Sequence, residues 1–266
     1  NRAAALKRQG YDEAAAKFPQ NVQCRTTHSL AYSAVRNQGY SHDMMSNNPR
    51  SYAFDIRGIN LSEDVHPDVF KTAIQGTIKR FCQSGSDSIS KRFVPKVPGL
   101  TEEAQEFLNQ SVPRAASNTW AQMIDKNDRL PLGFDGYLKL WALSRPMLPV
   151  DFIMLDEAQD TNGVVTNLVR HQNAQIVSVG DPHQQIYAWR GAEDALDILG
   201  GAITRLTKSF RFGENIAEAA DKVLTAMGNK FPLTGHTIKD SVSFEDSDQV
   251  DAVLCKTNAG VIDQAI

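Results

Sequence analysis

The feature that most constrains the fold of this chain is a pair of apolar runs of strand length with one helix-like segment between them. The runs occupy residues 150–155 and 174–179, and residues 162–171 separate them. Runs of this length that are apolar on both faces are typical of buried strands in a parallel sheet. The strand–helix–strand order predicts a right-handed parallel unit. We therefore expect an α/β fold in which both strands are central and buried on both faces.

Two carboxylates follow the first run directly. Asp156 and Glu157 stand at the C-terminal end of the predicted strand, where α/β folds place their ligands. In a phosphoryl-transfer site, an acid here holds Mg²⁺ mostly through water, because Mg²⁺ prefers oxygen ligands and retains its water shell. The neighbouring acid orients or deprotonates the attacking water. This interpretation makes Asp156 the metal residue and Glu157 the base. The alternative is that the strand end is acidic because it reaches solvent.

A polar and aromatic segment, residues 180–192, follows the second run. Gln184 can hydrogen-bond a terminal phosphate or the attacking water. Tyr187 and Trp189 offer flat faces for base stacking, which contributes about 1–3 kcal/mol per base. Arg190 can pair with phosphate or carboxylate. The segment would then contact ATP at one end and nucleic acid at the other, as a motor requires. The alternative is a surface loop with a buried tryptophan.

The sequence Asp-Glu-Ala-Gln-Asp at 156–160 and the segment 180–192 resemble motifs II and III of the UvrD/Rep-type superfamily 1 DNA helicases. Further segments agree in chain order: residues 1–4 resemble the end of motif Ia, 24–31 motif Ib, 206–211 the motif whose arginine reaches the γ-phosphate, and 252–259 the next conserved strand. Residues 135–141 and 181–185 point to the F-box DNA helicase branch and its microbial or phage relatives. The resemblance covers nearly the whole chain and is weaker at 41–127.

The resemblance implies a role for each matching residue. Asp156 and Glu157 would handle Mg²⁺ and water, Gln184 would sense phosphate, and Arg211 would be an arginine finger. The residues along the single-strand path would be Asn1, Thr26, His28, Tyr187, Trp189 and Arg190. The implied activity is ATP-dependent translocation and unwinding with 3′→5′ polarity, with ATP and Mg²⁺ as cofactors. Single-stranded DNA and duplex junctions would be the partners of a monomeric motor. For His28, a helix-cap or core histidine is the alternative.

The family fold implied by the resemblance is the RecA-like parallel sheet of P-loop NTPases. Residues 1–40 and 148–205 would form most of the first RecA-like domain (1A). Residues 41–147 would be its helical insertion (1B), and 206–266 would open a second RecA-like domain (2A). In this last section the sequence itself predicts a strand near 206, a helix at 214–227, a strand at 252–255 and a helix after 258.

Within residues 41–147, apolar spacing predicts three helices. One begins at Pro67 and carries an apolar face, a second begins near Thr101, and a third covers 136–143. The apolar face of the first consists of Phe70, Ile74, Ile78 and Phe81. Residues 84–98 are polar and then basic (Lys91, Arg92, Lys96), which predicts a solvated loop, with a DNA track as the alternative. Trp120 and Trp141 are expected in the core.

Composition excludes several classes of protein. The net charge is −3, so any DNA contact must come from a local surface rather than from overall basicity. No apolar run approaches the roughly 20 residues of a membrane helix. The 3 cysteines lie far apart without a CxxC pair, which argues against a zinc site or disulfide framework and fits a reducing compartment. We expect the cytoplasm or nucleoid in a bacterial or phage system, and the nucleus in a eukaryotic one.

The phosphate-cradling loop GxxxxGK[ST] is not found in these 266 residues. The family places it just before motif Ia, and both ends of the chain look cut, so we expect a fragment that does not turn over ATP alone although its parent does. Two other readings remain open. One is the motor part of a helicase–nuclease. The other is a degenerate helicase-like module that binds DNA or protein without hydrolysis.

Overall fold

The computed structural model describes residues 19, 21–46, 56, 59–128, 130–185, 195–243, 251–255 and 257–265. The chain divides into two compact units, Asn1–Gly200 and Gly201–Ile266. Among the described residues, no helix combines the length and apolar character that a membrane crossing requires.

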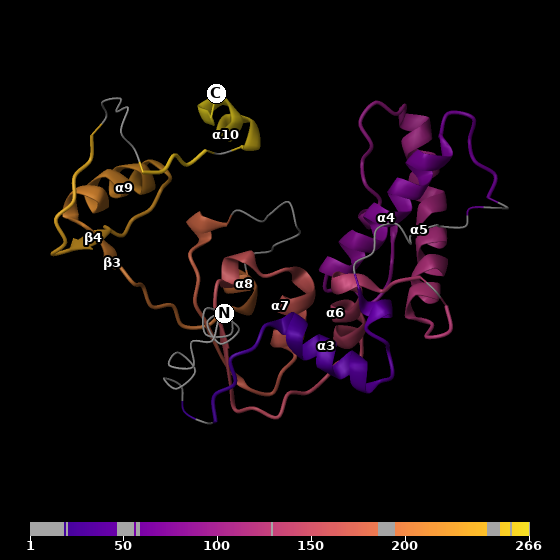
Figure 1. Cartoon of the computed structure of the whole chain (residues 1–266), viewed down its shortest axis with the longest axis horizontal. Coiled ribbons are helices and arrows are strands. Elements are labelled where there is room, and N and C mark those ends of the chain that lie inside the picture. The colour runs from indigo at the N-terminus through magenta and orange to yellow at the C-terminus, as the bar shows by residue number, and fades with distance from the viewer. Residues whose placement is uncertain are drawn as a thin grey trace. The chain divides into compact units, whose positions relative to one another are not determined.

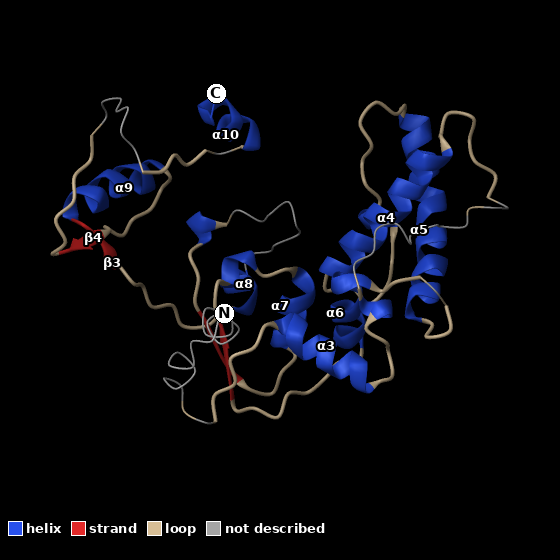
Figure 2. Ribbon diagram, in the orientation of Figure 1, coloured by secondary structure: helices blue, strands red, loops and turns tan. Residues whose placement is uncertain are grey.

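Helices dominate the first half of the first unit (Figures 1 and 2). Its long helices are α3 (Thr27–Asn37), α4 (Pro67–Gln83), α5 (Glu102–Ile124) and α6 (Gly133–Leu143), with short 3₁₀ turns η1 (Asp43–Met45) and η3 (Lys91–Phe93). Helix α4 packs beside α5, and α3 packs beside α6 (Figure 1). The three predicted helices of this region are thus confirmed, the third beginning three residues earlier than expected.

The starts of these helices follow from local capping. The Thr26 hydroxyl accepts a hydrogen bond from the Ser29 amide at 3.1 Å at the start of α3. His66 caps α4 through its Nδ1 atom, with Pro67 in the first helical position. The Thr101 hydroxyl caps α5 in the same manner as Thr26. Each cap satisfies an amide that the helix itself leaves without a partner.

The helical core is built on the apolar face of α4. Phe70, Ile74, Ile78 and Phe81 are all buried, which confirms the stripe read from the sequence. They pack with buried residues of α5 and α6, including Trp120 and Trp141, and both tryptophans lie in the core as expected. Burial of each large apolar side chain contributes about 1.5–3 kcal/mol, so this interface holds the helices together.

A parallel strand pair follows the helices. Strand β1 (Phe152–Leu155) pairs with β2 (Gln175–Ser178), in register from Phe152↔Gln175 to Leu155↔Ser178. Helix α7 (Gly163–Arg170) connects them, which confirms the predicted strand–helix–strand unit. A short helix α8 (Ala195–Leu199) and 3₁₀ turns η4 (Ala158–Asp160) and η5 (Pro182–Gln184) complete the described part of this unit.

The expected burial of β1 and β2 on both faces is wrong, since exposed and half-buried side chains alternate along each strand. Phe152 and Met154 are 59% and 76% exposed, whereas Ile153 packs against the helical core. Successive side chains of a strand point to opposite faces. Helices cover the face of Ile153, and among the described residues β2 is the one strand that pairs with β1. The apolar run therefore predicted the strand correctly, but it did not predict which face of the strand is covered.

The second unit has its own small parallel sheet. Strand β3 (Lys208–Gly213) leads into α9 (Glu214–Ala226), and β4 (Thr234–His236) pairs parallel to β3. Helix α10 (Asn258–Ala265) comes last, so both predicted helices are confirmed. The strand predicted at 252–255 is wrong. Described residues there pair with no strand, and Leu254 is 98% exposed. An apolar run becomes a strand only when a neighbour satisfies its backbone, and no described strand pairs with these residues.

Candidate functional site

The polar ends of β1 and β2 meet at one edge of the first sheet. The backbone pairing continues beyond both strands, since the Val179 amide donates to the Leu155 carbonyl at 2.8 Å and the Ala158 amide to the Val179 carbonyl at 2.9 Å. The residues after each strand are consequently held side by side. This edge carries Asp156 and Glu157 from β1 and Gly180 and Asp181 from β2, as the parallel order predicts.

Glu157 has an unusual backbone. Its φ and ψ angles are 52° and 48°, in the left-handed region that residues other than glycine rarely adopt. Such a conformation costs on the order of 1 kcal/mol or more and persists only where the surroundings enforce it. It turns the chain sharply from β1 into η4 and leaves the Glu157 side chain exposed at the sheet edge. Beside it, the Asp156 Oδ1 atom accepts a hydrogen bond from the Glu157 amide at 3.1 Å.

Gln159 connects the two strand ends. Its side chain is 1% exposed, and its Nε2 atom donates to the Glu157 carboxylate at 2.7 Å. Its Oε1 atom accepts from the Asp181 amide at 3.0 Å, and its backbone carbonyl accepts from the Gln185 side chain at 2.9 Å. One buried amide thus ties the acidic turn after β1 to the segment after β2.

Gly180 makes this connection sterically feasible. A Cβ atom at that position would overlap the Oε1 atom of Gln159 and lie 3.0 Å from the Ala158 nitrogen. The close approach of the two segments therefore requires glycine. Glycine is used where backbones must approach closely, and here the two backbones carry the candidate catalytic residues.

Asp181 extends the network to Gln184. Its two carboxylate oxygens accept from the His183 amide at 3.0 Å and from the Gln184 side chain at 2.8 Å. The chain of contacts runs from Glu157 through Gln159 and Asp181 to Gln184. Two of the predicted catalytic side chains are in this way brought to the same edge. Gln159 and Asp181 were not among the predicted site residues. Both residues stand inside the two motifs, and this position was the available signal. The sequence alone assigned no role to the amide of Gln159 or to the acid of Asp181.

The predicted DNA contacts on α3 have structural partners. Thr26 caps the helix through its hydroxyl. His28 is half-exposed and lies 3.8 Å from the Asp135 carboxylate, with its ring edge-on to Tyr137. The neighbouring His28 side chain, together with the hydrogen bond from Gln83, holds the pKa of Asp135 below its ordinary value although burial opposes this. His28 is therefore an anchored side chain with an open edge, rather than a core histidine.

The other predicted residues fall elsewhere. Arg211 is exposed on β3 in the second unit, which is a body separate from the sheet edge of Glu157. Asn1, Tyr187, Trp189 and Arg190 lie outside the described residues. Their predicted roles remain predictions.

The residues at this edge fit a hydrated Mg²⁺–nucleotide better than a fully caged metal ion. Among the described residues, no group of three or more histidine, cysteine or acidic side chains converges on one point. Mg²⁺ bound by one or two carboxylates keeps waters and substrate phosphates as its other ligands, and Asp156 with Glu157 offers such a pair. Two buried oxygens of the same segments, Asp160 Oδ1 and Ser178 Oγ, have no hydrogen-bond partner in the described part of the chain. Both oxygens can therefore form further hydrogen bonds at this edge.

Comparison with known proteins agrees with this geometry. A family model described as the UvrD/REP helicase N-terminal domain matches residues 3–196. The chain is 32% identical over 230 residues to F-box DNA helicase 1 of Gallus gallus. The matched region covers 78% of this chain and 21% of that protein. It is 27% identical over 252 residues to F-box DNA helicase protein 1 of Schizosaccharomyces pombe, covering 87% of this chain and 28% of that protein.

A bacterial relative is more distant. The ATP-dependent DNA helicase PcrA of Leuconostoc citreum is 28% identical over 122 residues, or 42% of this chain and 16% of that protein. The chain thus spans less than a third of the length of each of these three relatives. The matched family model covers both the helical region and the sheet edge with its acidic turn, and the chain belongs to the UvrD/REP helicase family.

Proposed function

We propose that this chain is part of an ATP-dependent DNA helicase that moves along single-stranded DNA with 3′→5′ polarity. The observation that carries the proposal is the contact chain from Glu157 through Gln159 and Asp181 to Gln184. It links the acidic turn to the segment that continues toward the aromatic residues Tyr187 and Trp189. A motor needs such a mechanical link between hydrolysis and DNA contact, and the relatives named DNA helicases support this reading.

Each residue of the edge has a task in this proposal. When bound, Mg–ATP supplies the phosphoryl group that is transferred to water. Asp156 would hold the metal through water molecules, and Glu157 would orient the attacking water and accept its proton. Gln184 would hydrogen-bond the terminal phosphate, while Asp181 and Gln159 fix the Glu157 and Gln184 side chains relative to each other. Arg211 contributes positive charge from the second unit.

The domain assignment remains part of the proposal. Residues 1–40 and 148–205 belong to the first RecA-like domain, 41–147 to its helical insertion, and 206–266 to the start of the second. Single-stranded DNA runs past Asn1, Thr26, His28, Tyr187, Trp189 and Arg190. The motor acts as a monomer at duplex junctions. These 266 residues by themselves do not hydrolyse ATP, because the phosphate-cradling loop is not among them.

The experiment that tests the proposal is unwinding by the intact protein. Duplexes with a 3′ or a 5′ single-stranded tail are incubated with ATP and Mg²⁺, and strand separation is followed by fluorescence. We expect separation of the 3′-tailed duplex only, together with ATP hydrolysis that rises when single-stranded DNA is added. DNA binding without any stimulated hydrolysis would instead support the degenerate module.

A further inference from the structure

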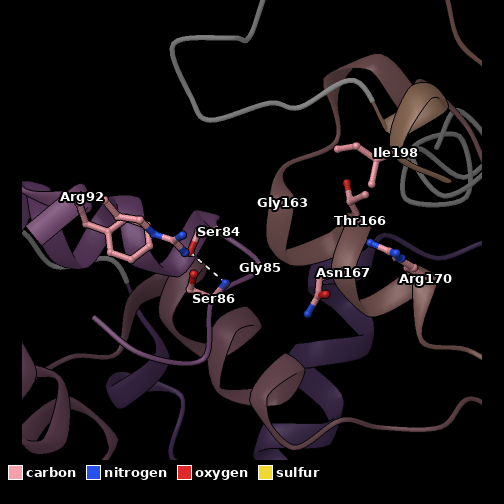
Figure 3. Close-up of a pocket in the computed structure, with 10 residues that line it drawn as sticks. Ser84, Gly85, Ser86, Arg92, Gly163, Thr166, Asn167, Arg170 and Ile198 are labelled. Atoms are coloured by element: carbon pink, nitrogen blue, oxygen red, sulfur yellow. Dashed lines mark hydrogen bonds between the residues drawn. The ribbon is translucent and has the colours of Figure 1, made fainter. Parts of the chain in front are cut away.

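A polar pocket of about 540 Å³ lies in the first unit, and the residues that line it do not include Asp156, Glu157 or Gln184. Figure 3 shows its two walls. One is the loop after α4 with η3, and the other is formed by α7 and α8. The residues that line it are Ser84, Gly85, Ser86, Arg92 and Phe93 on the first wall, and Gly163, Thr166, Asn167, Arg170 and Ile198 on the second. Its volume lies within the about 300–1,000 Å³ typical of ligand pockets.

The first wall is held rigid by a buried lysine. Lys139 is 1% exposed, and its Nζ atom donates to the Ser84 carbonyl at 2.8 Å and also to the Ser86 carbonyl. The same ammonium lies 4.3 Å from the centroid of the Phe81 ring. These contacts fix the loop by its carbonyl groups and place a buried positive charge behind it.

The two walls are in direct contact through Gly85. A Cβ atom there would lie 3.0 Å from the Asn167 Cβ atom and 3.2 Å from the Gly163 carbonyl oxygen. The loop can therefore approach α7 only because residue 85 is glycine. The pocket is preformed by packing rather than assembled by a ligand, and such preorganisation lowers the cost of binding.

The pocket is cationic. Arg92 projects from the first wall and Arg170 from the second (Figure 3), both exposed. Among the lining residues there is no carboxylate, and in the described part of the chain neither arginine forms an ion pair. The acid nearest in the loop, Asp87, is paired with Arg145 at 2.9 Å. The Arg92 guanidinium lies 4.7 Å from the centroid of the Phe93 ring, a contact that leaves its N–H groups able to donate. Two guanidinium groups and the Asn167 amide can therefore donate to an anion with several acceptor oxygens, which is the chemistry of a phosphate.

A short chain of side-chain contacts connects the first wall of the pocket to the predicted DNA contact at His28. The Gln83 side chain donates to Asp135 at 2.9 Å, the other oxygen of Asp135 faces His28, and Gln83 directly precedes Ser84. With a net charge of −3 on the whole chain, DNA must be held by such local clusters. We propose that this pocket binds a backbone phosphate of the DNA through Arg92 and Arg170. This inference rests on the proposed DNA-binding function and adds a contact site at the junction of the helical region and the sheet.

The test compares charge-reversal variants in DNA binding. Affinity for a fluorescent single-stranded oligonucleotide is measured by anisotropy at several salt concentrations for wild type, Arg92→Glu, Arg170→Glu and the double variant. The matched control is Arg114→Glu, an exposed arginine of α5 that does not line the pocket. Thermal melts verify that each variant folds. We expect each pocket variant to weaken binding roughly three- to tenfold and to reduce the salt slope by about 0.7–1, whereas Arg114→Glu changes neither.

The outcomes separate this inference from the proposed function. If Arg92→Glu and Arg170→Glu bind DNA like wild type while Trp189→Ala binds more weakly, the pocket assignment is overturned and the DNA-binding function stands. If the wild-type protein does not bind the oligonucleotide at all, the proposed function itself fails. A competition arm uses inorganic phosphate alone at constant ionic strength. If phosphate binds in the pocket without displacing DNA, the pocket is a small-anion site and the DNA assignment is overturned.

Discussion

The side-chain amide of Gln159 donates a hydrogen bond of 2.7 Å to the carboxylate of Glu157. The donor is buried and the acceptor is exposed, so the buried partner defines where the exposed one points. Because the same amide accepts a hydrogen bond from Asp181, the orientation of Glu157 depends on the position of the segment after β2. A displacement of that segment, for example on DNA contact, would be transmitted to the proposed base.

The first prediction concerns Gln159→Leu. The substitution removes the hydrogen bond to Glu157 and leaves the Asp181 amide without its acceptor. We expect a loss of about 1–3 kcal/mol in the free energy of unfolding and a fall of about 10- to 100-fold in DNA-stimulated ATP hydrolysis by the intact protein. Nucleotide binding should change little. Urea denaturation, steady-state kinetics and nucleotide titration measure the three quantities.

Gln172→Leu is the matched control. Gln172 also has a part-buried side chain with several hydrogen bonds, to Pro146, Leu168 and Leu148, but it lies away from the acidic turn. This variant should lose stability and keep its turnover at a temperature where it is folded. Equal losses of turnover in the two glutamine variants would show that Gln159 acts only through stability and does not position Glu157.

Gly180→Ala provides an independent test of the close approach between the strand ends. The added methyl group would meet Gln159 and the Ala158 backbone. Overpacking of this kind costs about 1–3 kcal/mol, which urea denaturation would detect, and turnover should fall with it. Gly260→Ala in helix α10 is the contrasting variant. Its new Cβ would come no nearer than 3.3 Å to another atom, the Cys255 Cβ, so it should lose less stability than Gly180→Ala. A Gly180→Ala protein as stable and active as wild type would contradict the described geometry.

Sequence patterns predicted the elements better than their surroundings. The spacing of Phe70, Ile74, Ile78 and Phe81 predicted α4 correctly. Helical periodicity is a local property of the sequence, and the helix face that it defines is the face that is buried. The run at 252–255 had similar local character and formed no strand, because strand formation depends on a partner distant in the chain. The exposure of Met154 was missed for the same reason, since periodicity cannot tell which face is covered.

The site was predictable in part. The shared location of Asp156, Glu157 and Gln184 could be predicted because motif positions at strand ends define one edge of a sheet, and their catalytic roles remain predictions. The tasks of Gln159 and Asp181 could not, because a buried amide that bridges two loops depends on three-dimensional contacts. Likewise, nothing in the sequence around Lys139 indicates a buried ammonium that holds the loop before Asp87. The sequence predicted a solvated loop around Arg92. Its position in a pocket wall depends on the packing of that loop against α7, which the sequence does not show.

The buried lysine gives a prediction for the pH dependence of stability. Burial lowers the pKa of Lys139 to about 8, whereas an unfolded lysine titrates near 10.4. Below about pH 8 both states are protonated, and the cost of burying the cation is fully present. Between about pH 8 and 10.4 the unfolded state binds more protons, so this residue makes stability rise with pH, by at most about 1.4 kcal/mol per pH unit.

Urea denaturation of wild type and Lys139→Met across that range measures the effect. The difference in unfolding free energy between the two should shift in favour of wild type as the pH rises. Cys82 packs in the same core and burial raises its pKa, which acts in the opposite direction, so both proteins should carry Cys82→Ala. A pH-independent difference would show that Lys139 stays protonated in the folded state throughout.

Asp135 gives a prediction of the same sign at acid pH, where stability again rises with pH. Its pKa is lowered in the folded state, first by the neighbouring His28 side chain. A lowered carboxyl pKa contributes stability above the ordinary aspartate value of about 3.9, and this contribution is lost as the pH falls through the folded value. Wild type should exceed Asp135→Asn in stability at pH 6, and the gap should close toward pH 3. Asp64→Asn, at an exposed loop position, should show no such closing gap.

The central claim is that Glu157 activates water for ATP hydrolysis, and Glu157→Gln in the intact protein tests it most directly. The substitution keeps the size of the side chain and removes its basicity. DNA-stimulated hydrolysis and nucleotide affinity are measured on the same preparation, with Glu103→Gln in the first turn of α5 as the matched control. We predict a fall in hydrolysis of at least about 100-fold with nucleotide affinity retained, and no change in the control. Turnover of Glu157→Gln at the wild-type rate would contradict the account.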